Sequence, residues 1–197
     1  MDLRELVISS CKICDGSGVL NNERCSCRGI YNILVSMQIG NFPDEVLLKL
    51  YNETLLSEFE LCDDDLYYNR ILTDPDFFVS NGCGLVIYGV GTMKAASYLV
   101  YKILEHDSSL DCGYQDEHTK ISVFDLSFPS GLEQLARVIK SRVLKLLPTI
   151  LLVNLLDVFD SNKSLADAVR WGYGMGLNGE VFRGVNVIEK IGISRWK

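Results

Sequence analysis

The chain has 197 residues, of which 48% are hydrophobic and 23% are charged, a composition typical of one globular domain or of a core with a small appendage. Its net charge of −7 argues against a broad nucleic-acid surface, which requires clustered Lys and Arg, although it does not exclude a local basic patch. No apolar run reaches the roughly 18 residues of a membrane span, and the first residues lack the basic and apolar regions of a signal peptide. We therefore expect a cytoplasmic protein without a membrane partner.

Four of the seven cysteines crowd into the first part of the chain, with the spacing Cys-x2-Cys, ten residues, Cys-x-Cys. They are Cys11, Cys14, Cys25 and Cys27. Four thiolates at this spacing are typical of a closed, structural zinc site, and residues 1–35 are predicted to form a zinc module. A redox dithiol or two disulfides are the alternatives, but a reducing compartment favours the metal.

Short helices are predicted between this module and the rest of the chain. Residues 28–39 carry apolar side chains at helical spacing, and Pro43 is placed to begin a second helix. A third short helix is expected around residues 67–72. We interpret residues 36–80 as a helical linker that docks a partner, because apolar helix faces that the core leaves uncovered usually mark interfaces.

The stretch at residues 84–97 predicts a buried strand, a glycine loop and a helix. Apolar β-formers follow Gly84, Gly89 and Gly91 allow a sharp turn, and Lys94 precedes a run of apolar residues at helical spacing. This is the frame of a phosphate-binding loop, in which backbone amides and a lysine hold phosphate groups. An ordinary strand–turn–helix with a chance lysine is the alternative.

The loop departs from the working pattern at two positions. Met93 stands where a glycine is usual, and its Cβ restricts positive φ. Ala95 stands where a Ser or Thr hydroxyl usually holds Mg²⁺. ATP binding is therefore left open, and no Mg²⁺-dependent hydrolysis is expected.

The rest of the chain predicts an α/β core with a mainly parallel sheet and helices on both faces, over residues 81–197. Strands are expected at residues 121–126, at 149–157 in the centre of the sheet, and at 181–191. A capping box at residues 130–133 is expected to begin a helix, and residues 164–171 are expected to form another. Residues 106–119 are polar and predict a loop.

The order of these motifs resembles a known family. The pattern Cys-x2-Cys-x-Gly-x-Gly, then Cys-x-Cys, then Ile-Gly-Asn-Phe-Pro at residues 39–43, then the glycine-loop strand, is similar to bacterial and phage helicase loaders of the DnaC/DnaI type. The resemblance covers about residues 10–157 and implies an AAA+ core behind a zinc-bearing module that contacts the helicase. The Cys-x2-Cys-x-Gly-x-Gly unit also occurs in DnaJ-type chaperones, which repeat it four times.

The resemblance carries over to the nucleotide site only in part. It implies that Lys94 is the phosphate-binding lysine and that residues 150–153 form the Walker B strand. Asn154 would then stand where the metal-holding aspartate is usual, and Asp157 would be its substitute. We do not expect the helical lid of such modules, so the expected core is truncated.

These features favour a non-catalytic, AAA+-like adaptor in DNA replication that acts through protein partners, in a bacterial host cytoplasm if the chain is phage-encoded. The expected partners are a helicase, other replication proteins or AAA+ neighbours, with any contact to DNA indirect. An active ATPase helicase loader is one alternative. A zinc-ribbon protein that binds nucleic acid or acts in transcription is the other.

Overall fold

The protein is described from a computed structural model. The structure describes residues 1–55, 66–88, 92–126, 131–153, 161–173 and 185–188. None of the helices in these ranges is long and apolar enough to cross a membrane.

The described part of the first 80 residues is mainly helical, with one small hairpin. Their elements are η1 (Glu5–Ser9), β1 (Val19–Leu20), β2 (Glu23–Arg24), α1 (Ser26–Ile39), α2 (Asp44–Lys49), η2 (Leu50–Leu55), α3 (Leu66–Thr73) and α4 (Pro75–Ser80). Helices α1, α2 and α3 confirm the sequence predictions, and Pro43 precedes α2 as expected. Helix α4 was not predicted. It begins because Pro75 suits a first helical turn and the Asp74 carboxylate accepts a hydrogen bond from the Phe77 amide at 3.3 Å.

A parallel sheet of five strands, in the order β4-β5-β6-β3-β7, forms the core of the rest. The elements are β3 (Gly84–Tyr88), α5 (Thr92–His106), β4 (Cys112–Tyr114), β5 (Ile121–Asp125), α6 (Leu132–Leu144), β6 (Thr149–Val153), α8 (Lys163–Tyr173) and β7 (Val185–Ile188). The prediction of an α/β fold with a parallel sheet is confirmed, and β6, whose residues are all buried, is central as expected.

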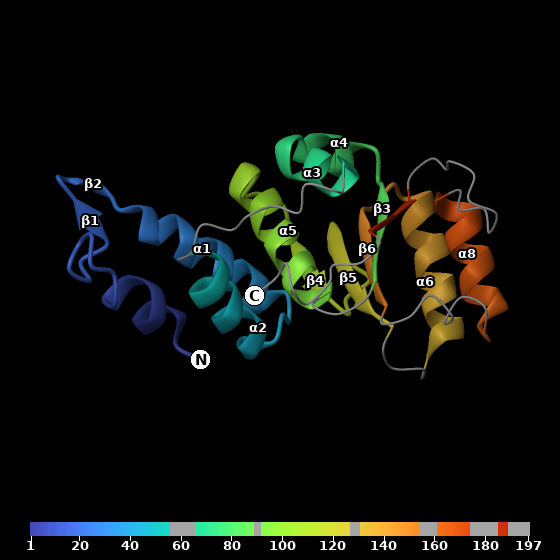
Figure 1. Cartoon of the computed structure of the whole chain (residues 1–197), viewed down its shortest axis with the longest axis horizontal. Coiled ribbons are helices and arrows are strands. Elements are labelled where there is room, and N and C mark those ends of the chain that lie inside the picture. The colour runs from blue at the N-terminus through green and yellow to red at the C-terminus, as the bar shows by residue number, and fades with distance from the viewer. Residues whose placement is uncertain (56–65, 89–91, 127–130, 154–160, 174–184, 189–197) are drawn as a thin grey trace.

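Helices cover both faces of the sheet (Figure 1). Alternate residues of each strand point to opposite faces, so Leu85 and Ile87 of β3 join the apolar cluster of α1, α2 and α5, whereas Val86 joins that of α6 and α8. The first cluster is a single group of contacting residues that includes members from Leu3 to Leu152. The apolar faces of α1 and α2 are therefore largely buried in the core, whereas the prediction that residues 36–80 dock a partner assumed that these faces are uncovered.

The end of α1 covers the edge of the sheet. Strand β4 is the edge strand, and the Tyr114 amide donates to the Gly40 carbonyl at 2.7 Å. A Cβ on Gly40 would lie 2.1 Å from the Cys112 carbonyl oxygen, so only glycine allows this approach. An unpaired edge is a site for association with other chains, and here the N-terminal segment protects part of it.

The connection from β4 to β5 is unusually short. The two strands are parallel, with Cys112 opposite Ile121, yet only residues 115–120 join them, where a parallel crossover normally needs about a dozen residues or more. The polar stretch at 106–119 was predicted to be a loop, and the structure places β4 within it. Three residues, Cys-Gly-Tyr, carry too little hydrophobic pattern to reveal a strand.

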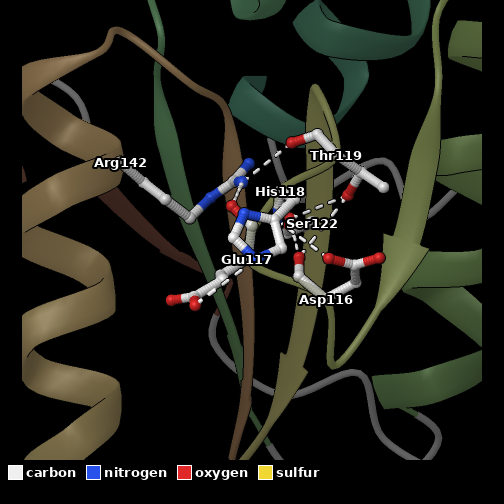
Figure 2. A network of polar contacts seen from close by, with 6 residues as sticks. All are labelled: Asp116, Glu117, His118, Thr119, Ser122 and Arg142. Carbon is white, nitrogen blue, oxygen red and sulfur yellow. Dashed lines mark hydrogen bonds and ion pairs between the residues drawn. The ribbon is translucent and has the colours of Figure 1, made fainter.

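Arg142 of α6 holds this tight connection (Figure 2). Its side chain is only 1% exposed, and its guanidinium donates to the carbonyls of Glu117, Thr119, Lys120 and Pro148 and to the Thr149 hydroxyl, at 2.7–3.0 Å.

The predicted capping box at residues 130–133 is not what begins α6, because the N-cap residue is Gly131, with φ 90° and no side-chain cap. Ser130 lies outside the described residues.

Candidate functional site

The four N-terminal cysteines come together as one cluster. The ligand atoms of Cys11, Cys14, Cys25 and Cys27 all lie within 4.8 Å of one another, and three of the residues are buried. The Cys11 and Cys25 sulfurs are 3.9 Å apart, and those of Cys14 and Cys27 are 3.7 Å apart. Within the described residues, this is the one group of three or more such side chains that could hold a metal ion.

Local backbone features place each pair. Gly16 and Gly18 have φ angles of 75° and 70°, so the chain turns back after Cys14, and the Gly18 amide then donates to the Cys14 sulfur at 3.2 Å. The second pair lies at the start of α1, with Cys25 as the N-cap residue and Cys27 in the first turn. This explains the tight Cys-x-Cys spacing, and the positive end of the helix favours thiolates there.

The environment shifts two of the thiols in opposite directions when no metal is bound. For Cys14, burial opposes ionisation, but the Gly18 amide and the neighbouring cysteines outweigh it, and its pKa is lowered to about 7. For Cys27, burial raises the pKa to about 12, and hydrogen bonds with Cys25, Cys14 and Cys11 act in the same direction. A cation would stabilise both thiolates, so metal binding would release protons.

The sulfur distances fit a tetrahedral metal site better than disulfides. A zinc–sulfur bond of about 2.3 Å places the sulfur atoms of a tetrahedron about 3.8 Å apart, close to both measured distances. All four cysteines are free thiols in the structure, whereas a disulfide requires about 2.05 Å between sulfurs. The cluster is therefore a possible metal site that is compatible with structural zinc.

Lys94 lies in the first turn of α5, after β3, as the strand–loop–helix frame predicts. It lines a cleft of about 540 Å³ between α5 and α2, which also receives Lys49, Ser97, Tyr114 and Asp125. Ala95 is fully buried in the core, so it contributes packing at the position where phosphate-binding loops usually carry a metal-binding hydroxyl. Gly89, Gly91, Asn154 and Asp157 lie outside the described residues, so their predicted roles stay predictions.

The sequence interpretation missed Asp125. It ends β5, and its carboxylate accepts a hydrogen bond from the Tyr114 hydroxyl at 3.5 Å while it lines the same cleft as Lys94. Ligands of open parallel sheets bind outside the carboxyl ends of the strands, where Asp125 lies. The signal was present in the run Ile-Ser-Val-Phe-Asp, in which an acidic residue ends an apolar strand, whereas the family resemblance pointed to the strand before Asn154.

Comparison with known proteins leaves the family open. No protein-family model matches the chain, and neither the curated proteins nor the solved structures give a match. The function must therefore be argued from the cysteine cluster, the cleft beside Lys94 and the surfaces around them.

Proposed function

We propose that this chain is a non-catalytic adaptor that acts through protein partners in DNA replication and holds a structural zinc ion in its four-cysteine cluster. The observation that carries the proposal is an exposed apolar surface on the cysteine module, at the end of the molecule farthest from α6 and α8 (Figure 1). The replication setting is supported by the resemblance of the cysteine and glycine pattern to helicase loaders.

Zinc is the metal that this ligand set favours. Thiolates are soft ligands, and a closed set of four leaves no open position for substrate or water, which is typical of structural zinc. The hairpin has little else to hold it in place, because β1 and β2 contain two residues each and their side chains are exposed. Metal binding would thus supply much of its folding free energy.

The exposed surface, which we call the apolar tip, consists of Ile13, Val19 and Leu20. Ile13 lies between two cysteines and is 63% exposed, and the two hairpin residues are 41% and 42% exposed. A metal-held turn presents these side chains rigidly, so little conformational entropy is lost when a partner covers them. Three exposed large apolar residues within one short segment are the surface that we assign to the partner.

The test is binding to a purified bacterial replicative helicase, the partner that the resemblance implies. We expect the double variant Ile13→Ser/Leu20→Ser to weaken binding by at least about tenfold, because each of the two truncations costs about 1 kcal/mol and a total of about 1.4 kcal/mol is already tenfold. The control is Ile39→Ser, which removes a more exposed side chain, 78% exposed, away from the tip. Zinc content should stay unchanged in both variants.

Two outcomes would contradict the proposal. One is the absence of helicase binding by the zinc-loaded wild-type chain. The other is an equal loss of binding in Ile39→Ser and in the tip variant, which would move the interface away from the module.

Nucleotide binding is a second candidate function, and the position of Asp125 favours it. The expectation of no hydrolysis rested on Ala95 and Asn154, yet the cleft beside Lys94 contains a carboxylate from β5 that could hold Mg²⁺. Titration with a fluorescent ATP analogue, with and without Mg²⁺, tests this candidate. Binding that depends on Mg²⁺ and is lost in both Lys94→Ala and Asp125→Asn would support it, and the absence of binding in the wild type would exclude it.

A further inference from the structure

A second and larger cleft lies on the other side of Tyr114 and Asp125. It encloses about 710 Å³ between the β4–β5 connection and the first turns of α6. Its walls come from four parts of the chain: Asn41 after α1, residues 114–118, the end of β5, and α6. It is distinct from the cleft beside Lys94, because the described linings of the two clefts have just two residues in common, Tyr114 and Asp125.

The rim of this cleft is acidic. Asp116, Glu117 and Asp125 contribute carboxylates, and the described lining contains no Lys or Arg. Its one imidazole belongs to His118, whose Nε2 lies 3.6 Å from Glu117 Oε1. Glu117 and His118 are well exposed, with the His118 side chain at 84%. The carboxylates are too dispersed to hold an ion together, because the cysteine cluster is the one compact ligand group found in the described residues. The cleft therefore suits an extended cationic chain better than a metal ion.

The floor of the cleft is apolar. Phe124 of β5 forms it together with one side of α6, where Leu132, Leu135 and Val138 recur at helical spacing. These three leucine and valine side chains are only partly buried against the core. A ligand that covers them gains apolar contact, and a free amine or a small ion would not provide it.

The acidic wall is held in place from within the protein (Figure 2). Arg142 binds the carbonyls of Glu117 and Thr119, and the Ser122 hydroxyl donates to the Asp116 carbonyl. The Asp116 carboxylate also accepts from the His118 amide at 2.9 Å. A fixed wall of this kind can present its charges without reordering when a partner binds.

From these features we propose that the cleft docks a segment of a protein partner in which basic and apolar residues alternate. Its Arg or Lys side chains would lie at the acidic rim and its aliphatic side chains on the α6 floor. Charge complementarity identifies this occupant, because the rim carries carboxylates and the chain as a whole carries −7, which repels nucleic acid. The inference extends the proposed adaptor function, since a protein that joins two partners needs a surface separate from the apolar tip.

The test uses the full, zinc-loaded chain labelled with nitrogen-15 and a defined probe, the peptide acetyl-Arg-Leu-Arg-Leu-Arg-Leu-amide. We expect saturable shifts of the amide signals of residues 115–118 and of the first turns of α6. The same peptide with Gln in place of Arg should bind at least about tenfold more weakly, because it keeps the apolar contacts and loses the charge pairing.

A pair of charge reversals locates the site. Glu117 lines the cleft, and Glu117→Lys keeps the backbone carbonyl that accepts from Arg142. The control, Glu133→Lys, makes the same change in net charge at an exposed α6 residue outside the lining. We expect Glu117→Lys to weaken peptide binding on the order of fivefold and Glu133→Lys to change it less than about twofold.

The inference is overturned if the Gln peptide binds as tightly as the Arg peptide, if the shifts map away from the cleft, or if both reversals weaken binding equally. The last result would mean that net charge alone attracts the peptide. The tip variant Ile13→Ser/Leu20→Ser should bind the peptide normally, so failure of this inference and failure of the proposed helicase contact give different results.

Discussion

Arg142 shows how one buried side chain can determine a local fold. A guanidinium has five N–H donors, and here five acceptors from the β4–β5 connection and the start of β6 receive them. Three of these acceptors, the carbonyls of Glu117, Thr119 and Lys120, lie in a reversal too short for regular secondary structure to satisfy. Arginine is thus the residue that lets two parallel strands be joined by residues 115–120, and its planar, always charged group cannot be replaced by lysine without loss.

Replacing Arg142 should destabilise the protein severely. In Arg142→Met, three part-buried carbonyls and the buried Pro148 carbonyl lose the guanidinium donors, and each unsatisfied acceptor costs about 1–3 kcal/mol, so we expect the free energy of unfolding to fall by at least about 3 kcal/mol. Urea denaturation measures the loss. The control is Arg137→Met on an exposed position of the same helix, expected to change stability by no more than about 0.5 kcal/mol. Equal effects of the two substitutions would contradict the assigned role.

The metal affinity of the cysteine cluster should depend steeply on pH. Zinc binds thiolates, and the metal-free Cys27 thiol, with a pKa of about 12, is protonated throughout the range from pH 6 to pH 8. Its proton is released on binding at every pH in that range, and Cys14, with a pKa of about 7, releases more of its proton as the pH falls. Lowering the pH from 8 to 6 should therefore raise the zinc Kd by at least about 100-fold, measured by chelator competition. A Kd that is constant over this range would show that the site is not bound through these thiolates.

At the scale of elements, the sequence predicted those with a strong hydrophobic pattern and missed those that tertiary contacts create. Strands β3, β5 and β6 and helices α5, α6 and α8 each carry such a pattern. Strand β4 has no hydrophobic pattern of its own. It is a strand because it pairs with β5 and contacts Gly40, and neither contact can be inferred from the local sequence. The cysteine site could be predicted because its spacing is local. Asp125 and Lys94 line one cleft only because the sheet places β5 near α5, so no local sequence pattern could predict that they lie together.

The contact between α1 and β4 gives a test with an internal control. In Gly40→Ala the new Cβ would lie 2.1 Å from the Cys112 carbonyl oxygen, so α1 must move off the edge strand, at a cost of about 1–3 kcal/mol. Gly29 lies in the same helix with nothing within 4 Å of its Cβ position, and Gly29→Ala should stabilise by about 0.5–1 kcal/mol. Thermal unfolding of both variants measures the difference, and effects of the same sign would contradict the contact.

At the scale of the whole molecule, the chain combines two kinds of stabilisation. The sheet and its helices bury continuous apolar clusters on both faces, whereas the hairpin of the cysteine module has exposed side chains and depends on what binds the four thiols. The two meet in α1, whose first turn contains Cys27 and whose end covers β4. We therefore expect the loss of structure that follows metal removal to end within α1, because Ile33, Leu34 and Met37 are buried in the core.

Removal of the metal tests this division directly. After chelation of zinc, hydrogen–deuterium exchange should increase strongly over residues 11–28, because the module loses most of its folding free energy, while β3, β5 and β6 keep their protection. Cys14→Ser should reproduce this pattern without chelator, and Cys83→Ser, which removes a buried cysteine outside the cluster, should retain the zinc. Helicase binding through the apolar tip should be lost in parallel with the protection of residues 11–28. If chelation exposed the sheet as well, or left the module protected, the module and the core would not be separate units of stability.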